Sequence, residues 1–278
     1  MYEKIRSGSR RKWRFAVGAV VIAAATLTTG AASATPRPDD RVKPAILLVH
    51  GAFADGSSWN GVATRPRHDG YEVTMAAVPL RGLTYDSAYI RSVLRSMPRK
   101  TIVAGHSYGG AVITNAAAGE PKAAGLVYVA AFAPDQNETV GALDDRFGGP
   151  AKKITTPTEY PLPSGSGTAV ELTIAQDKFH HYFAQDVPRN EALTMAAGQR
   201  PVAVAAFGEV SGVPAWKTLP SWYVLARDDR MIPAAGQREM ARRMNATVVE
   251  RWASHAITVS QPGSVAEVIE TAARRTRS

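Results

Sequence analysis

The chain has 278 residues, enough for one large domain or two small ones. Hydrophobic residues make up 45% and charged residues 21%, which argues against a mainly disordered chain. Cysteine is absent from the sequence, which excludes disulfides, cysteine nucleophiles, thiolate metal sites and a lipid-modified cysteine anchor. The net charge is +9, but residues 1–34 hold six basic residues and one acid, and the remainder has a net charge of +4. The remainder shows no basic patch interleaved with aromatic residues, so we do not expect nucleic-acid binding.

The N-terminal segment has the pattern of an export signal. Residues 10–14 read Arg-Arg-Lys-Trp-Arg, an uncharged stretch rich in Ala, Val and Ile follows, and Ala32-Ser33-Ala34 ends it with small residues. This order predicts a secretory signal peptide over residues 1–34, cleaved after Ala34, and hence a secreted protein without stable membrane association. A retained signal anchor is the alternative, although the strongly apolar part is short for a spanning helix of ~20 residues. Arg10-Arg11 also leaves a twin-arginine export route open, although Arg14 stands where that signal prefers an apolar residue.

The rest of the chain alternates between short apolar runs and segments with helical spacing. Residues 35–43 are polar and proline-containing, and predict a disordered lead-in to a domain over 44–278. Strands are predicted at 45–49, 72–78, 101–104, 126–132, 222–226 and 247–252. Helices are predicted near 85–97, 108–118, 234–244 and 263–274. Such alternation predicts an α/β fold with a mostly parallel central sheet and helices on both of its faces.

One long connection interrupts this alternation. Residues 134–218 separate two predicted strands and are far too many for a simple loop in a compact domain. The first part, 147–168, is rich in Gly, Pro, Thr and Ser, and helical patterns follow near 170–184 and 188–198. We therefore predict a helical lid inserted into the sheet domain.

A nucleophile motif follows the third predicted strand. Gly105-His106-Ser107-Tyr108-Gly109 matches G-x-S-x-G, with a strand before it and a helix after it, which is the context that the motif requires. The tight turn projects the serine above the sheet at a helix N-terminus, where developing negative charge is favoured. Ser107 is therefore the predicted catalytic nucleophile.

A serine hydroxyl needs a base, and the base needs an orienting acid. The sequence has six histidines, at positions 50, 68, 106, 180, 181 and 255. His255 follows the last predicted strand, at the sheet edge where α/β proteins place their sites, and is the predicted base. Asp229 is the predicted acid, because it follows the strand at 222–226 and lies between nucleophile and base in the chain. Asp228, one residue away, is its rival, and Asp135 after an earlier strand is a further alternative.

The oxyanion of an acyl-transfer intermediate needs two preorganised donors. One is expected from the amide of Tyr108, directly after the nucleophile. The other is expected from the loop His50-Gly51-Ala52-Phe53, and Ala52 is the residue we select. His50 is expected to hold the shape of this loop through hydrogen bonds.

These motifs resemble those of the α/β-hydrolase superfamily. His-Gly-Ala-Phe, Gly-His-Ser-Tyr-Gly-Gly, Asp-Arg-x-Ile-Pro and Ser-His-Ala occur in its order and spacing over residues 44–275. More narrowly, the chain resembles the plant methyl-esterase and hydroxynitrile-lyase branch and its bacterial esterase relatives. The lyases carry threonine where this chain has Gly51, and lysine where it has Ala256. A serine nucleophile also differs from the aspartate of dehalogenases and epoxide hydrolases.

The resemblance implies a serine esterase that cleaves small to medium apolar carboxylic esters through an acyl-enzyme. Such a triad mechanism uses no metal and no organic cofactor. Phe53 beside the oxyanion loop and Phe183, Met195 and Trp216 in the lid are the expected substrate contacts. Two other functions stay open: acyl transfer to an acceptor other than water, and small-molecule binding on a hydrolase scaffold without turnover.

Overall fold

The computed structural model describes residues 42–163, 165 and 167–277. The predicted signal peptide and residues 35–41 of the predicted lead-in lie outside the described residues, so both stay predictions. Among the described residues, no helix has both the length and the apolar character that a membrane span requires.

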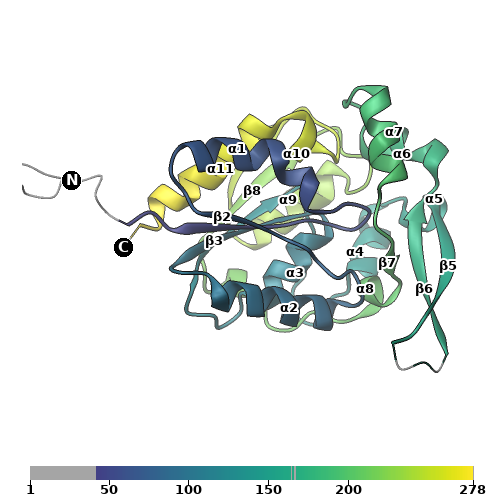
Figure 1. Cartoon of the computed structure of the whole chain (residues 1–278), viewed down its shortest axis with the longest axis horizontal. Coiled ribbons are helices and arrows are strands. Elements are labelled where there is room, and N and C mark those ends of the chain that lie inside the picture. Colours follow the sequence, from purple (N-terminus) through teal and green to yellow (C-terminus); the bar gives the residue numbers. More distant parts are fainter. Residues whose placement is uncertain (1–41, 164, 166, 278) are drawn as a thin grey trace, which may run out of the picture. The chain divides into compact units, whose positions relative to one another are not determined.

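A six-stranded parallel sheet forms the centre of the fold (Figure 1), with the strand order β2-β1-β3-β4-β8-β9. The strands are β1 (Ala45–Val49), β2 (Val73–Ala76), β3 (Thr101–His106), β4 (Ala123–Val129), β8 (Ser221–Ala226) and β9 (Thr247–Arg251). Each predicted strand is present, with bounds that differ by a few residues. The predicted α/β architecture with a mostly parallel sheet is therefore confirmed.

Both faces of the sheet are buried. Successive strand residues point to opposite faces, so neighbours in one strand belong to different cores. Leu47, Val103 and Tyr128 belong to one hydrophobic core, while Leu48 and Ile102 belong to the other. The first core lies under α2 (Leu83–Ser96), α3 (Tyr108–Ala116) and α9 (Ala234–Arg243). The second lies under α1 (Asn60–His68) and α11 (Pro262–Arg275). The sequence analysis did not predict α1 or the short helix η1 (Gly56–Trp59) that precedes it.

The insertion between β4 and β8 contains short helices, as predicted for the lid, and also a small antiparallel sheet that was not predicted. Its antiparallel sheet consists of β5 (Thr155–Pro161), β6 (Thr168–Ile174) and β7 (Val202–Ala203). Residues 170–174 alternate apolar and polar side chains, and β6 contains Thr, Val and Ile, which favours a strand over the helix predicted from 170. In Figure 1 this hairpin lies beside α6 and α7, at the right of the view.

The helices of the insertion are short. They are α4 (Val140–Phe147), α5 (Ala151–Ile154), α6 (Gln176–Phe183), α7 (Arg189–Ala197), α8 (Ala205–Gly208) and the 3-10 helix η2 (Ala215–Lys217). A further short helix, α10 (Ile257–Ser260), follows β9 and leads into α11. The predicted helix at 188–198 corresponds to α7, and the end of the one predicted at 170–184 corresponds to α6.

Candidate active site

Ser107 lies in the tight turn between β3 and α3. Its backbone has φ 53° and ψ −124°, a region that residues with a side chain rarely adopt. The turn is held against the neighbouring strand, because a Cβ on Gly109 would lie 2.5 Å from the carbonyl oxygen of Val49. The glycine two positions after Ser107 therefore allows α3 to start directly above the sheet.

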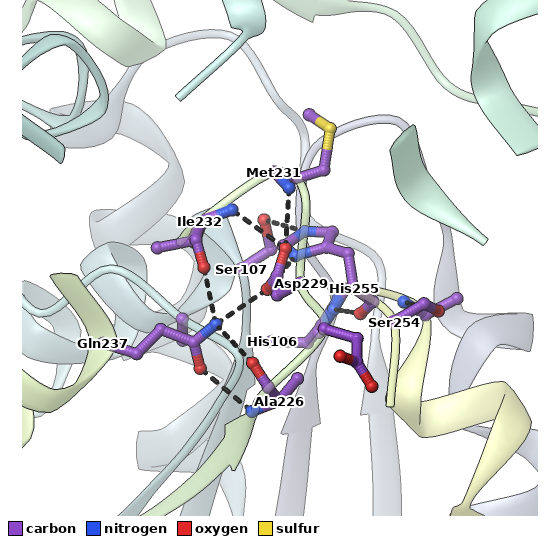
Figure 2. A network of polar contacts seen from close by, with 12 residues as sticks. His106, Ser107, Ala226, Asp229, Met231, Ile232, Gln237, Ser254 and His255 are labelled. Carbon is purple, nitrogen blue, oxygen red and sulfur yellow. Dashed lines mark hydrogen bonds and ion pairs between the residues drawn. The ribbon is translucent and has the colours of Figure 1, made fainter. Parts of the chain in front are cut away.

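Ser107, His255 and Asp229 form a continuous chain of hydrogen bonds (Figure 2). The Ser107 Oγ and His255 Nε2 atoms are 2.8 Å apart, and His255 Nδ1 is 2.8 Å from Asp229 Oδ2. A carboxylate only accepts hydrogen bonds, so Nδ1 carries a proton and Nε2 is left free to accept one from the serine hydroxyl. All three residues are buried. The arrangement is able to withdraw the serine proton during nucleophilic attack.

The Asp229 carboxylate is held by donors on both oxygens. Oδ1 accepts hydrogen bonds from the amides of Met231, at 2.7 Å, and Ile232, at 2.9 Å. Oδ2 accepts from Gln237 Nε2 at 2.9 Å, in addition to His255. Gln237 is fully buried and also bonds the backbone of Ala226, as Figure 2 shows. These contacts fix the carboxylate in the orientation that the histidine needs.

The two alternative acids lie elsewhere. Asp228 is exposed, and its backbone carbonyl accepts a hydrogen bond from Gln185. Asp135 forms an ion pair with Lys217, with 2.5 Å between Oδ1 and Nζ. Within the described part of the chain, Asp229 is thus the one of the three candidate acids that contacts His255.

His50 and His106 are buried beside the site but act as neutral hydrogen-bond partners. Burial lowers the pKa of His50 to about 4 and that of His106 to about 3. His50 Nε2 accepts from the amide of Val78, so its Nδ1 donates to the carbonyl of Gly51. This is the loop-holding contact that the sequence analysis predicted for His50. His106 donates from Nε2 to the backbone carbonyl of His255 at 2.8 Å.

The two predicted oxyanion donors have free amides. Among the described residues, neither the Ala52 amide nor the Tyr108 amide donates a hydrogen bond. Both residues line a small cavity beside Ser107, of ≈ 20 Å³. The Tyr108 hydroxyl donates to Asp86 Oδ2 at 2.8 Å, which anchors the side chain away from that amide. The site therefore offers two unpaired amides next to Ser107, an arrangement that is able to stabilise a tetrahedral oxyanion.

The four expected substrate contacts lie in different surroundings. Phe53 lines the small cavity and also a cleft of ≈ 520 Å³, whose wall includes Met195. Phe183 packs edge-on against the His255 ring at 4.8 Å and lines neither space. Trp216 is buried, donates from Nε1 to the carbonyl of Pro134, and likewise lines neither. The geometry thus separates Phe53 and Met195, which face open space, from two residues that support the surrounding structure.

A family comparison covers nearly all of the described domain. The model of the "Alpha/beta hydrolase family" matches residues 46–268. The chain belongs to the alpha/beta hydrolase family. The resemblance seen in the sequence motifs is therefore confirmed.

Individual relatives of this alpha/beta hydrolase are distant. A pyrethroid hydrolase from Sphingobium wenxiniae is 28% identical over 244 residues, covering 81% of this chain and 85% of its own. An alpha/beta hydrolase from Aspergillus novofumigatus is 25% identical over 256 residues, covering 84% and 97%. The solved structure of a methylesterase from Arabidopsis has a TM-score of 0.68 at 19% identity, covering 84% of this chain and 99% of its own. The last likeness shows the fold.

Several residues of the hydrolase site carried no signal in the sequence analysis. Gln237 and Asp86 lie in helices and read as ordinary polar residues, yet Gln237 binds the candidate acid and Asp86 binds Tyr108. Asp144, in α4 of the insertion, lines the small cavity beside Ser107. Burial raises the pKa of its carboxyl to about 6. No local sequence pattern distinguishes this aspartate from other acidic residues of the insertion, so its place beside Ser107 is seen only in the three-dimensional structure.

Proposed function

We propose that this protein is a serine esterase that hydrolyses small to medium apolar carboxylic esters. The observation that carries the proposal is the pair of 2.8 Å contacts that link Ser107 Oγ to His255 and His255 to Asp229. The relative named as a pyrethroid hydrolase supports hydrolysis as the class of reaction. The free amides of Ala52 and Tyr108 supply the remaining requirement of acyl transfer.

The proposed reaction has two steps. Ser107 Oγ attacks the ester carbonyl while its proton passes to His255 Nε2, and the carbonyl electron pair moves onto the oxygen held by the Ala52 and Tyr108 amides. Collapse of this intermediate breaks the bond to the alcohol, which leaves with the proton from His255. Water then gives a proton to His255 and attacks the acyl-enzyme, which releases the acid and restores Ser107. Asp229 keeps the imidazole in the productive tautomer and stabilises its cation.

The loop around Gly51 supports ester hydrolysis over cyanohydrin cleavage. A Cβ at Gly51 would lie 2.6 Å from the Ser107 Cβ and 2.8 Å from the carbonyl oxygen of His106. The threonine that the lyases carry at this position therefore does not fit here unless the nucleophile moves. Ala256 likewise places a methyl group, and no ammonium, after the candidate base.

The proposal is tested with p-nitrophenyl esters and two proteins, the wild type and Ser107→Ala. We expect the wild type to turn over these esters and the variant to lose about 10⁴-fold or more in kcat. Added alcohols in the same assay separate the two acyl acceptors, because an acyltransferase would form the new ester in preference to the acid. If the wild type binds these esters but does not turn them over, the protein is a small-molecule-binding protein and not an esterase.

We also propose export of the mature chain from residue 35. The support is the charged, apolar and small-residue order of residues 1–34. N-terminal sequencing of protein recovered outside the cell is expected to begin at Thr35. Recovery of an intact residue 1 in the membrane fraction would show a retained anchor.

A further inference from the structure

Two spaces of very different size meet at the side chain of Phe53. The cavity beside Ser107 has a volume of ≈ 20 Å³, and a cleft that Phe53 also lines has a volume of ≈ 520 Å³. Phe53 lines both, is buried, and adopts a positive φ of 60°. Its ring stacks on that of Phe207, with 6.5 Å between the ring centres.

The small cavity is the place for the acyl group. It contains Ser107 and the two residues with free amides, Ala52 and Tyr108, so the scissile carbonyl must lie there. Most of the remaining wall is apolar and includes Phe132, Phe207, Met231 and Ile232. A cavity of this volume has room for about one water-sized group, which is close to the size of a methyl. Longer acyl chains would meet aromatic rings.

The large cleft is lined in part by the chain segment that follows the candidate base. Its wall includes Thr258 and Val259 in α10, three and four residues after His255. The alcohol of an ester receives its proton from the catalytic histidine, so it leaves on the side of that histidine. The volume of the cleft falls within the range of pockets that hold drug-sized ligands.

The lining of the cleft indicates which alcohols suit it. Phe53, Met195 and Val259 form apolar surface, and Asp55 and Glu191 are the charged residues among those that line it. The cleft lies between η1 and α1 on one side and α7 of the insertion on the other. The apolar surface suits an uncharged alcohol, and the two acidic side chains disfavour an anionic one.

We propose that the enzyme takes esters that join a short acyl group, of about acetyl size, to a bulky uncharged alcohol. The acyl group occupies the small cavity, and the alcohol occupies the large cleft. This proposal rests on the proposed esterase function and names the substrate class of that same site.

Two ester series test the proposal on the mature protein. The first keeps p-nitrophenol and lengthens the acyl group from acetate to hexanoate, and kcat/KM is expected to fall at least ~10-fold. The second keeps acetate and varies alcohols of similar acidity, from ethanol to cyclohexylmethanol and 2-(2-naphthyl)ethanol, and kcat/KM is expected to rise. A preference for hexanoate, or no gain with bulky alcohols, would overturn the proposal.

Variants of the two spaces separate their roles. Phe207→Ala enlarges the small cavity and is expected to raise kcat/KM for the hexanoate ester, relative to kcat/KM for the acetate ester, by about 10-fold. Phe207→Leu gives a milder change in the same direction if the alanine variant folds poorly. Met195→Trp fills the cleft and is expected to lower kcat/KM for the naphthyl ester about 10-fold more than kcat/KM for ethyl acetate. Leu193→Trp, on an exposed position of the same helix, is the matched control and should alter neither.

The outcomes distinguish this proposal from the esterase function itself. If no ester in either series is hydrolysed in a Ser107-dependent way, the proposed function fails. If hydrolysis depends on Ser107 but long acyl chains are preferred, or Met195→Trp lowers both acetates equally, the substrate class alone is wrong.

Discussion

The imidazole of His106 donates a hydrogen bond to the backbone carbonyl of His255, with 2.8 Å between Nε2 and the oxygen. The two ring centres are 4.8 Å apart. Burial keeps His106 neutral, and a carbonyl only accepts, so the proton lies on Nε2. The residue that precedes the proposed nucleophile in the chain therefore holds the loop of the proposed base, 149 residues further on.

Loss of this contact is expected to misplace the base without removing it. We expect His106→Leu to lower kcat about 10- to 100-fold with KM nearly unchanged, because small displacements of a catalytic group have effects of this size. His106→Gln, which retains an N–H donor, should recover part of the rate. Steady-state kinetics on a p-nitrophenyl ester measure both variants. Equal rates for the leucine variant and the wild type would show that the contact does not position His255.

The register of the acid is tested by two adjacent substitutions. Asp229→Asn is expected to lower kcat about 10⁴-fold, because an amide side chain favours the wrong tautomer of His255. Asp228→Asn should change kcat by less than about threefold, since its carboxylate is exposed and does not contact the histidine. The reverse order of effects would assign the role to Asp228.

Gln237 is expected to matter for stability as well as rate. Its side chain bonds the Asp229 carboxylate, the carbonyl of Ile232 and the amide of Ala226. Gln237→Leu removes this partner from the Ala226 amide and the Ile232 carbonyl and takes one donor from Asp229, which should lower the free energy of unfolding by about 1–3 kcal/mol. Urea unfolding measures the change. The control is Gln261→Leu at a partly exposed glutamine that donates to the carbonyl of Trp252, and this variant should cost less than about 1 kcal/mol. Equal losses for the two variants would contradict the role of Gln237.

Acid should destabilise the fold through its buried neutral histidines. The folded-state pKa is about 4 for His50 and about 3 for His106. Both are below the unfolded value near 6.5, so the unfolded chain binds more protons as the pH falls through this range. Each histidine thus contributes stability above about pH 6.5 that is lost toward pH 4, at about 1.4 kcal/mol per pH unit. His106→Gln should reduce the slope of unfolding free energy against pH by that amount between pH 6 and 4, and an unchanged slope would contradict this assignment.

Asp144 is expected to change stability with pH in the opposite direction to the two histidines. Burial raises the pKa of its carboxyl to about 6, and the nearby Asp145 also raises it, while the Ala151 amide, Lys152 and His255 lower it. The contribution of its protonation to stability is present below about pH 4 and is lost as the pH rises through about 6. The free energy of unfolding of Asp144→Asn, relative to that of the wild type, is therefore expected to be about 1–2 kcal/mol higher at pH 7.5 than at pH 4.5, allowing for screening by solvent. Urea unfolding at the two pH values measures this, and an equal difference at both would contradict it.

Short sequence patterns were enough to predict the central sheet and the turn that carries Ser107. The apolar runs marked the six parallel strands, and the spacing around Ser107 marked the strand-to-helix turn. The choice between Asp228 and Asp229 needed the turn geometry, in which one carboxylate accepts from the amides of Met231 and Ile232. A shift of one residue is invisible to composition.

Long-range packing explains what the sequence analysis missed. The strand at Thr168–Ile174 is stabilised by pairing with β5 and β7, and its short alternation is easily taken for a helix. Phe53, Phe183 and Trp216 are all aromatic residues that the sequence made candidates for substrate contact. Of these three, only Phe53 lines the cavity or the cleft. Which aromatic side chains line a cavity depends on contacts between distant segments, which no local pattern encodes.

Trapping the acyl-enzyme shows directly whether Ser107 is the nucleophile. The wild type and Ser107→Ala are mixed with p-nitrophenyl acetate, quenched in acid within the first turnover, and analysed by peptide mass spectrometry. We expect an acetyl group on the Ser107 peptide of the wild type, and no adduct and no burst of p-nitrophenol in the variant. An adduct on another residue, or hydrolysis at the wild-type rate by Ser107→Ala, would contradict this role of Ser107.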